Sequence, residues 1–493
     1  MNKVRISRIE LQNFKNVRLG VVDFSKESHK YAASILGLYG QNGSGKTALV
    51  EALGLLKHSL SAVPLSMIAE AVPWWDLISV DSDFATLGFR FLVDDEVLGS
   101  GCEVDYRFSI RLRRLELPAG VNAEKNGPVK MDIFNETLSF SYTTESSRKS
   151  RLQTYIDTTE CDTFKPDSKY RLFAGSDKKI FADLVVEKRL ALETSRSYIF
   201  SPVFYDIISR SASANDGNVD APQDIRACLT VLRRLREFGT HNLMVVQGSA
   251  FSLLNLNMMP LSFAYASEKG RTSGTVILPF KGPTLLPKQL FEVVRNVLGE
   301  MNIVLDQLVP GLTISIREIG KRLMQDGSIG IDAELVSHKN SRPIPLRNES
   351  EGIRKIISVL HLLIEVYNNP TVTAVIDELD SGIFEYLLGE LLKIVSERGR
   401  GQLIFTSHNL RPLETLDKDF IAFTTTNPDN RYIRLRNVKP SNNLRDFCYR
   451  EIIIGGQNEK IYESTSNAKI AFAFAQAGDN IYNAYGREAG HES

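Results

Sequence analysis

Cysteine is scarce in this sequence and falls into no recognisable motif. Four cysteines occur in 493 residues, at positions 102, 161, 228 and 448, far apart and without CxxC or Cys/His spacing. This pattern argues against a zinc motif and against a disulfide framework. We therefore expect reduced thiols, as in a cytoplasmic protein.

Net charge and long hydrophobic runs are also absent. Lys and Arg total 59 and Asp and Glu total 59, so overall charge favours neither a nucleic-acid nor a membrane partner. The apolar run at 356–366 is too short to cross a bilayer and contains polar residues. The first 14 residues alternate polar and apolar side chains, unlike a secretory signal. We expect a cytoplasmic protein without a membrane partner.

Length and patterning predict an α/β protein of two or three lobes. The composition, 43% apolar and 24% charged, is that of a globular chain. Period-two alternation over 84–142 predicts an antiparallel β layer, and an alternation of helix and strand follows from about 345. No internal repeat and no long heptad pattern is present. The expected divisions are an N-terminal lobe over 1–200, an inserted mainly helical lobe over 201–340, a second α/β lobe over 341–440 and an extension over 441–493.

A glycine-rich segment with a lysine and a threonine carries the strongest chemical signal. Residues 40–47, GQNGSGKT, match G-x-x-x-x-G-K-[ST] between a predicted strand and a predicted helix. Glycines let the backbone amides turn toward phosphates, Lys46 can reach the β- and γ-phosphates, and the Thr47 hydroxyl can bind Mg²⁺. Chance is the alternative, and the flanking strand and helix argue against it. The predicted ATP-binding residues here are Gly40, Asn42, Gly43, Ser44, Gly45, Lys46 and Thr47.

Two adjacent carboxylates follow a short apolar run at 371–376. A buried parallel strand has this composition, and α/β sheets bind ligands at the carboxyl ends of their strands. We expect Asp377 to hold Mg²⁺ and Glu378 to orient or deprotonate the attacking water. The competing interpretation is a strand that ends in a solvated acidic turn. The phosphate-binding motif at 40–47, a P-loop, argues against that interpretation because the two motifs occur in the same chain.

Two further motifs are weaker on their own. His408 lies at the end of a short apolar strand that starts at Gly401, and it is predicted to contact the γ-phosphate, although a lone histidine is more often structural. Ser350 and Gly352 open an amphipathic helix, where Ser350 is a good N-cap. A serine–glycine helix start can also bind an anion.

Taken in order, these four elements resemble the ABC-type ATPases of the RecF/SMC/OLD branch. The phrase Asn13-Phe14-Lys15 is also similar to the start of that branch, whereas Ser350-Glu351-Gly352 departs from its usual LSGGQ wording. The resemblance covers roughly 1–200 and 340–440. It implies a P-loop NTPase fold that uses ATP and Mg²⁺, with Lys46, Glu378 and His408 as catalytic residues.

The resemblance also implies a head-to-tail homo-oligomer. Ser350 and Gly352 of one protomer would complete the ATP site of another, and Asp380 and Ser381 would cross the same interface as a D-loop. Similar stand-alone ATPases occur in the PARIS and Septu phage-defence systems and beside RloB-like proteins. The resemblance therefore implies an ATP-dependent sensor or scaffold that controls a separate effector protein, a nuclease or a toxin.

Two other outputs are kept as alternatives. One is a DNA-repair or chromosome-maintenance ATPase that clamps DNA in the RecF manner. Basic stretches at 111–114, 148–151 and 233–236 could meet phosphates, but their acidic neighbours favour a solvated face or a protein interface. The other is a self-contained nuclease, which the lack of a carboxylate cluster after His408 disfavours.

Overall fold

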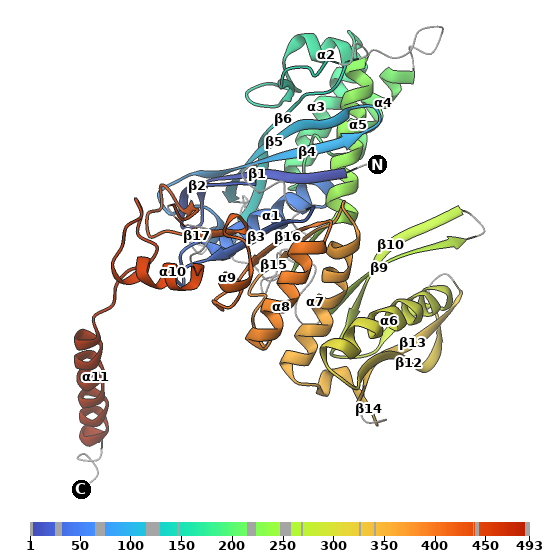
Figure 1. Cartoon of the computed structure of the whole chain (residues 1–493). Coiled ribbons are helices and arrows are strands. Elements are labelled where there is room, and N and C mark those ends of the chain that lie inside the picture. The colour runs from blue at the N-terminus through green and yellow to red at the C-terminus, as the bar shows by residue number, and fades with distance from the viewer. Residues whose placement is uncertain are drawn as a thin grey trace.

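The computed structural model has a mixed α/β fold (Figure 1). It describes residues 3–24, 32–64, 74–114, 129–144, 148–213, 223–246, 258–267, 270–324, 327–339, 342–436, 438 and 443–488. Among these residues, no helix has both the length and the apolar character needed to cross a membrane.

A largely parallel sheet forms the centre of the molecule. Its strands run in the order β18-β17-β3-β16-β15-β8, and only β18 is antiparallel to its neighbour. The strands are β3 (Ser34–Tyr39), β8 (Leu243–Val246), β15 (Thr373–Ile376), β16 (Gln402–Thr406), β17 (Ile421–Thr424) and β18 (Tyr432–Ile433). The four strands from β3 to β8 in this order consist wholly of buried residues, as expected for a parallel sheet covered on both faces.

Alternate residues of these strands face two separate apolar cores. In β3, Leu36 and Leu38 belong to the core around α1 (Lys46–Ser61), whereas Ile35 and Tyr39 belong to the core around α7 (Glu351–Asn368) and α8 (Glu385–Arg398). The period-two geometry of a strand produces this division. The sheet is therefore sandwiched between helices, and its strand ends are free to build a site.

An antiparallel layer covers α1 on the side away from the central sheet (Figure 1). This confirms the β layer expected over 84–142. The strand order is β2-β1-β4-β5-β6-β7. The strands are β1 (Lys3–Phe14), β2 (Val17–Asp23), β4 (Phe84–Asp95), β5 (Gly99–Arg114), β6 (Val129–Phe140) and β7 (Gln153–Asp157). Four helices pack at its far end: α2 (Asp167–Ala174), α3 (Lys178–Glu193), α4 (Pro202–Ser213) and α5 (Gln223–Glu237).

The expectation of a mainly helical lobe over 201–340 is wrong. Helices α4 and α5 join the core of the antiparallel layer, and β8 joins the central sheet. What remains is mostly β structure with one long helix, α6 (Lys288–Leu308). The strands are the hairpin β9 (Met258–Ser267) and β10 (Gly270–Pro279), and the sheet β11 (Thr284–Pro287), β12 (Leu312–Leu323), β13 (Ile329–Lys339) and β14 (Arg342–Pro345). The helical periodicity of α4, α5 and α6 dominates the sequence pattern of this region, although β9, β10, β12 and β13 are each 10 to 12 residues long.

The C-terminal part of the chain returns to an alternation of helices and strands and ends in a projecting helix. From about 345 the chain alternates α7, β15, α8 and β16, as predicted. α9 (Pro412–Thr415) and α10 (Leu444–Ile453) pack beside the sheet, and α11 (Asn467–Glu488) extends away from it (Figure 1). Single turns complete the described chain: η2 (Trp74–Leu77), η3 (Phe238–Asn242), η4 (Leu346–Asn348) and η5 (Lys418–Phe420).

Candidate nucleotide site

The glycine-rich segment forms the turn between β3 and α1, where the sequence predicts a P-loop. Gly40, Gly43 and Gly45 have φ angles of 150°, 72° and 96°, which L side chains rarely adopt. A Cβ on Gly40 would lie 1.8 Å from the Thr424 hydroxyl oxygen. Sterics and backbone conformation therefore both require glycine at this position, and the loop opens directly into the amino end of α1.

Lys46 bends back over this loop. Its Nζ donates to the carbonyl oxygens of Gly40 and Gln41, at 2.8 and 3.0 Å. Burial lowers the pKa of the Lys46 ammonium, and the nearby carboxylates of Asp377 and Glu378 oppose that shift. The ammonium thus rests on carbonyl oxygens that a triphosphate would replace as partners.

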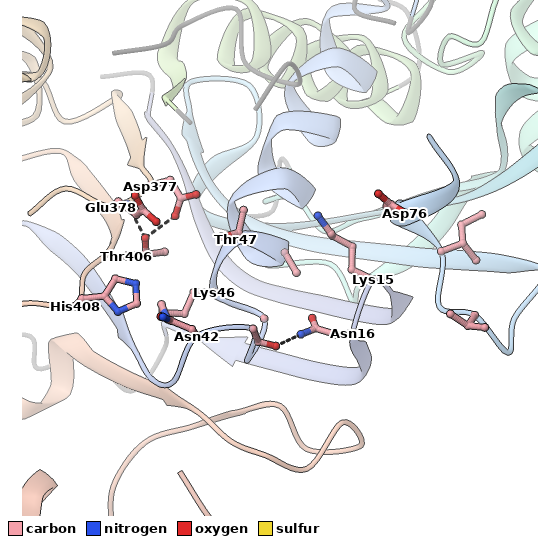
Figure 2. Close-up of a pocket in the computed structure, with 15 residues that line it drawn as sticks. Lys15, Asn16, Asn42, Lys46, Thr47, Asp76, Asp377, Glu378, Thr406 and His408 are labelled. Carbon is pink, nitrogen blue, oxygen red and sulfur yellow. Dashed lines mark hydrogen bonds between the residues drawn. The ribbon is translucent and has the colours of Figure 1, made fainter. Parts of the chain in front are cut away.

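A cavity of about 720 Å³ brings the predicted motifs together (Figure 2). It is lined by P-loop residues, by the acidic pair after β15 and by the histidine after β16. Among the predicted site residues, the lining includes Asn42, Gly43, Gly45, Lys46, Thr47, Asp377, Glu378 and His408. Segments more than 300 positions apart in the sequence therefore contribute to one pocket.

The acidic pair lies directly after β15, at the carboxyl end of the parallel sheet. Asp377 Oδ1 accepts a hydrogen bond of 2.5 Å from the Thr406 hydroxyl, and the Glu378 amide donates to the same hydroxyl oxygen at 2.7 Å. Glu378 has a φ of 47°, in the left-handed region that non-glycine residues seldom occupy. Such backbone strain is concentrated at functional sites because the surrounding structure must hold it in place.

The donor set suits magnesium. The Thr47 hydroxyl and the Asp377 carboxylate both line the cavity, and hard oxygen donors of this kind bind Mg²⁺ together with phosphate oxygens and water. In the described part of the chain, no group of three His, Cys, Asp or Glu side chains is arranged to hold a metal by itself. The protein would therefore supply only part of the coordination, as is usual for Mg²⁺ bound with a nucleotide.

His408 lines the cavity, and its backbone is fixed by Asp380. Asp380 Oδ2 accepts from the amides of His408 and Asn409, at 3.0 and 2.9 Å. The carboxylate predicted to cross a protomer interface is therefore engaged within its own chain. It ties the acidic turn to the histidine loop.

The serine–glycine helix start lies outside this cavity. Ser350 is the N-cap of α7, and its hydroxyl accepts from the Ile353 amide at 3.3 Å. Gly352 packs against Gly382, whose carbonyl oxygen would lie 2.4 Å from a Cβ at position 352. Neither Ser350 nor Gly352 is among the residues that line the nucleotide cavity of their own chain.

A buried lysine connects α7 to the acidic turn. Lys355 is 1% exposed, and its Nζ donates to the Glu378 carbonyl oxygen at 3.1 Å. Burial lowers the pKa of Lys355 from 10.5 to about 8, against the opposing effect of Asp380, Asp377 and Glu378. The helix that begins at Ser350 is therefore in direct contact with the turn that carries the acidic pair.

Several lining residues were not predicted from the sequence. They include Lys15, Asn16, Asp76, Ile78 and Val80, and Lys15 and Asp76 lie on the side of the cavity away from the acidic pair (Figure 2). The phrase Asn13-Phe14-Lys15 resembles the start of the RecF/SMC/OLD branch, but that resemblance predicts no place for Lys15 in the site. Lys15 Nζ donates to Glu51 Oε2 at 2.6 Å, and burial raises the pKa of the Glu51 carboxyl.

Residues of the C-terminal part of the chain form hydrogen bonds with the P-loop. The Tyr432 hydroxyl donates to the Gly45 carbonyl oxygen at 2.8 Å, and the hydroxyls of Thr424 and Ser44 are hydrogen-bonded. The amide of Glu463 donates to Gln41 Oε1 at 2.9 Å. These contacts hold the loop's shape before any ligand binds.

Comparisons with known proteins find only distant structural likenesses. No protein-family model matches the sequence, and no curated protein matches it. One similar solved structure is the Smc head domain with an extended coiled coil, bound to the C-terminal domain of ScpA, from Pyrococcus furiosus. The two chains are 15% identical in sequence. The structural match covers 88% of this chain and 96% of the Smc chain, with a TM-score of 0.37.

Two further solved structures are similar at the same level. The SMC head domain from Thermotoga maritima is 15% identical, with 88% and 99% coverage of this chain and that chain and a TM-score of 0.34. The recombination mediator protein RecF with ATP is 12% identical, with 83% and 94% coverage and a TM-score of 0.32. Likenesses this distant say nothing about individual residues or activity.

Proposed function

We propose that this chain binds ATP with Mg²⁺ and hydrolyses it to ADP and phosphate. The observation that carries the proposal is the shared cavity: Lys46 and Thr47, the acidic pair Asp377 and Glu378, and His408 all line it. A phosphate-binding loop alone would support binding. The carboxylates and the histidine opposite the loop supply what hydrolysis also needs.

Each residue has a role that its position supports. The P-loop amides and Lys46 stabilise negative charge on the phosphates, and Thr47 and Asp377 would hold Mg²⁺, which neutralises that charge further. Glu378 accepts a proton from water as the water oxygen bonds to the γ-phosphorus and the bond to the ADP oxygen breaks. His408 contacts the γ-phosphate.

Association between copies is part of the proposal. Ser350 is exposed at the start of α7 and lies outside its own cavity, so its helix end is free to meet a phosphate of another copy. Gly382, beside Gly352, is exposed as well. A head-to-tail pair would thereby use Ser350 and Gly352 in trans.

The output that we propose is control of a separate effector protein in anti-phage defence, which rests on the sequence resemblance. The described basic stretches give little support to the DNA-clamp alternative, because several of their side chains are already paired. Arg111 and Arg113 face the buried Asp132 carboxylate, and Arg234 bonds Asp95. Such pairs leave less positive charge for a phosphate backbone.

Nucleotide binding by Lys46→Ala tests the proposal at its first step. We expect ATP affinity to fall at least about tenfold, since a charge-assisted contact contributes about 1.5–3 kcal/mol. Lys393→Ala, which alters an exposed lysine of α8, is the matched control and should bind as the wild type does. Equal affinities of the two variants would contradict the assignment.

The effector is tested by affinity purification of Glu378→Gln from its native cell with ATP present. A stoichiometric protein partner would support the sensor–effector proposal. Bound DNA without a protein partner would favour the clamp instead.

A further inference from the structure

One hydroxyl group contacts both members of the acidic pair. Thr406 ends β16, is 1% exposed and lines the nucleotide cavity. Its hydroxyl donates to Asp377 Oδ1 at 2.5 Å and accepts from the Glu378 amide at 2.7 Å (Figure 2). A threonine hydroxyl can donate one hydrogen bond, and Thr406 donates its hydrogen bond to the Asp377 carboxylate.

The strand register explains why Thr406 reaches both residues. β15 and β16 are parallel neighbours, with Ile376 opposite Phe405, so the next residues along both strands emerge side by side. The Leu379 amide also donates to the Thr406 carbonyl oxygen at 3.0 Å. The turn after β15 is therefore attached to Thr406 through both its side chain and its backbone.

The conformation of Glu378 makes this attachment consequential. Its φ of 47° is unfavourable for a residue with a side chain and persists only where neighbouring contacts enforce it. Its amide is directed at the Thr406 hydroxyl, and its carbonyl oxygen accepts from Lys355 and from the Ser381 amide. Loss of the hydroxyl would leave the Glu378 amide without its acceptor and the half-buried Asp377 carboxylate freer to move.

We propose that Thr406 is a positioning residue for the nucleotide site. Its hydroxyl holds the Asp377 carboxylate in the orientation suited to Mg²⁺ and holds the Glu378 turn in the conformation that presents its carboxylate to water. This inference rests on the proposed ATP site and adds a residue that no motif identified. Groups that orient a metal ligand in this way typically affect metal affinity or activity by about 10- to 100-fold.

The test compares Thr406→Val, which keeps the shape and removes the hydroxyl, with Thr406→Ser, which keeps the hydroxyl. The control is Thr373→Val, because Thr373 is also buried, lies at the other end of β15 and bonds Gln402 instead of the site. Two quantities are measured for each protein: kcat for ATP, and the ratio of ATP dissociation constants in EDTA and in Mg²⁺.

For Thr406→Val we expect kcat to fall about 10- to 100-fold and the Mg²⁺-dependent gain in ATP affinity to shrink by a similar factor. Affinity in EDTA should match the wild type, Thr406→Ser should restore most of both quantities, and Thr373→Val should change neither. Wild-type kcat and Mg²⁺ dependence in Thr406→Val would overturn the proposal. Equal defects in the serine and valine variants would also overturn it, since shape would then be the cause.

Two further outcomes separate this inference from the proposed function. If the wild type binds ATP in a Mg²⁺-dependent way without hydrolysing it, hydrolysis is refuted, and the affinity ratio still decides the role of Thr406. If the wild type binds no nucleotide, both proposals fail. Should Thr406→Val not fold, Thr406→Ala against Thr406→Ser gives the same comparison.

Discussion

The buried lysine beneath the acidic turn gives stability a defined pH dependence. Lys355 is 1% exposed, and burial lowers its pKa from 10.5 to about 8. The folded state therefore disfavours the charged ammonium. Below pH 8 the folded protein carries the full cost of burying that charge. As pH rises from about 8 to 10.5, the folded protein releases the proton while the unfolded chain keeps it, so the free energy of unfolding rises.

The magnitude follows from the two pKa values. With pKa values of about 8 folded and 10.5 unfolded, linkage gives a gain of about 2 kcal/mol between about pH 7 and about pH 9.5. Lys355→Met keeps a similar length, removes the charge and therefore lacks this gain. Lys57, whose pKa burial also lowers to about 8, titrates identically in both proteins and cancels in the difference.

Urea unfolding of the nucleotide-free proteins in EDTA measures this effect. We expect the free energy of unfolding of the wild type, minus that of Lys355→Met, to increase by about 2 kcal/mol from about pH 7 to about pH 9.5. A difference that stays constant, or that decreases with pH, would refute the reasoning. It would mean that Lys355 keeps its ordinary pKa in the fold.

Three further predictions concern other parts of the structure. Gly40→Ala should abolish ATP binding, measured by calorimetry, because its Cβ would lie 1.8 Å from the Thr424 hydroxyl oxygen; wild-type affinity would disprove the steric account. Arg234→Met should cost about 3–5 kcal/mol in urea unfolding, because it leaves the buried Asp95 carboxylate unpaired; a loss below about 1 kcal/mol would contradict this. Ser350→Arg should keep ATP binding but lose ATP-dependent association in light scattering and most turnover, and unchanged association would exclude the head-to-tail arrangement.

The central motifs could be predicted because each combines local pattern with local chemistry. The loop at 40–47 needs its glycines for the backbone turn, and Asp377 and His408 follow short apolar strands whose carboxyl ends meet at one edge of the sheet. The ends of neighbouring parallel strands must converge, so their cavity could be anticipated. In the structure, one pocket is lined by Asn42, Gly43, Gly45, Lys46, Thr47, Asp377 and His408.

The remaining features depend on contacts between distant segments. β8, at 243–246, is four residues long and has no periodicity that would distinguish it from a loop or helix. Thr406 matters only because β16 pairs with β15, and Asp380 turns inward because the amides after β16 lie within its reach. Nothing local in the sequence indicates these partners.

ATP turnover of the wild type against Glu378→Gln tests the central claim most directly. The matched control is Glu397→Gln, which alters an exposed carboxylate near the C-terminal end of α8, away from the acidic pair. The account predicts Mg²⁺-dependent hydrolysis in the wild type and the control, and a loss of about 10²- to 10⁴-fold in Glu378→Gln with ATP binding retained. Turnover in Glu378→Gln equal to that of the control would contradict it.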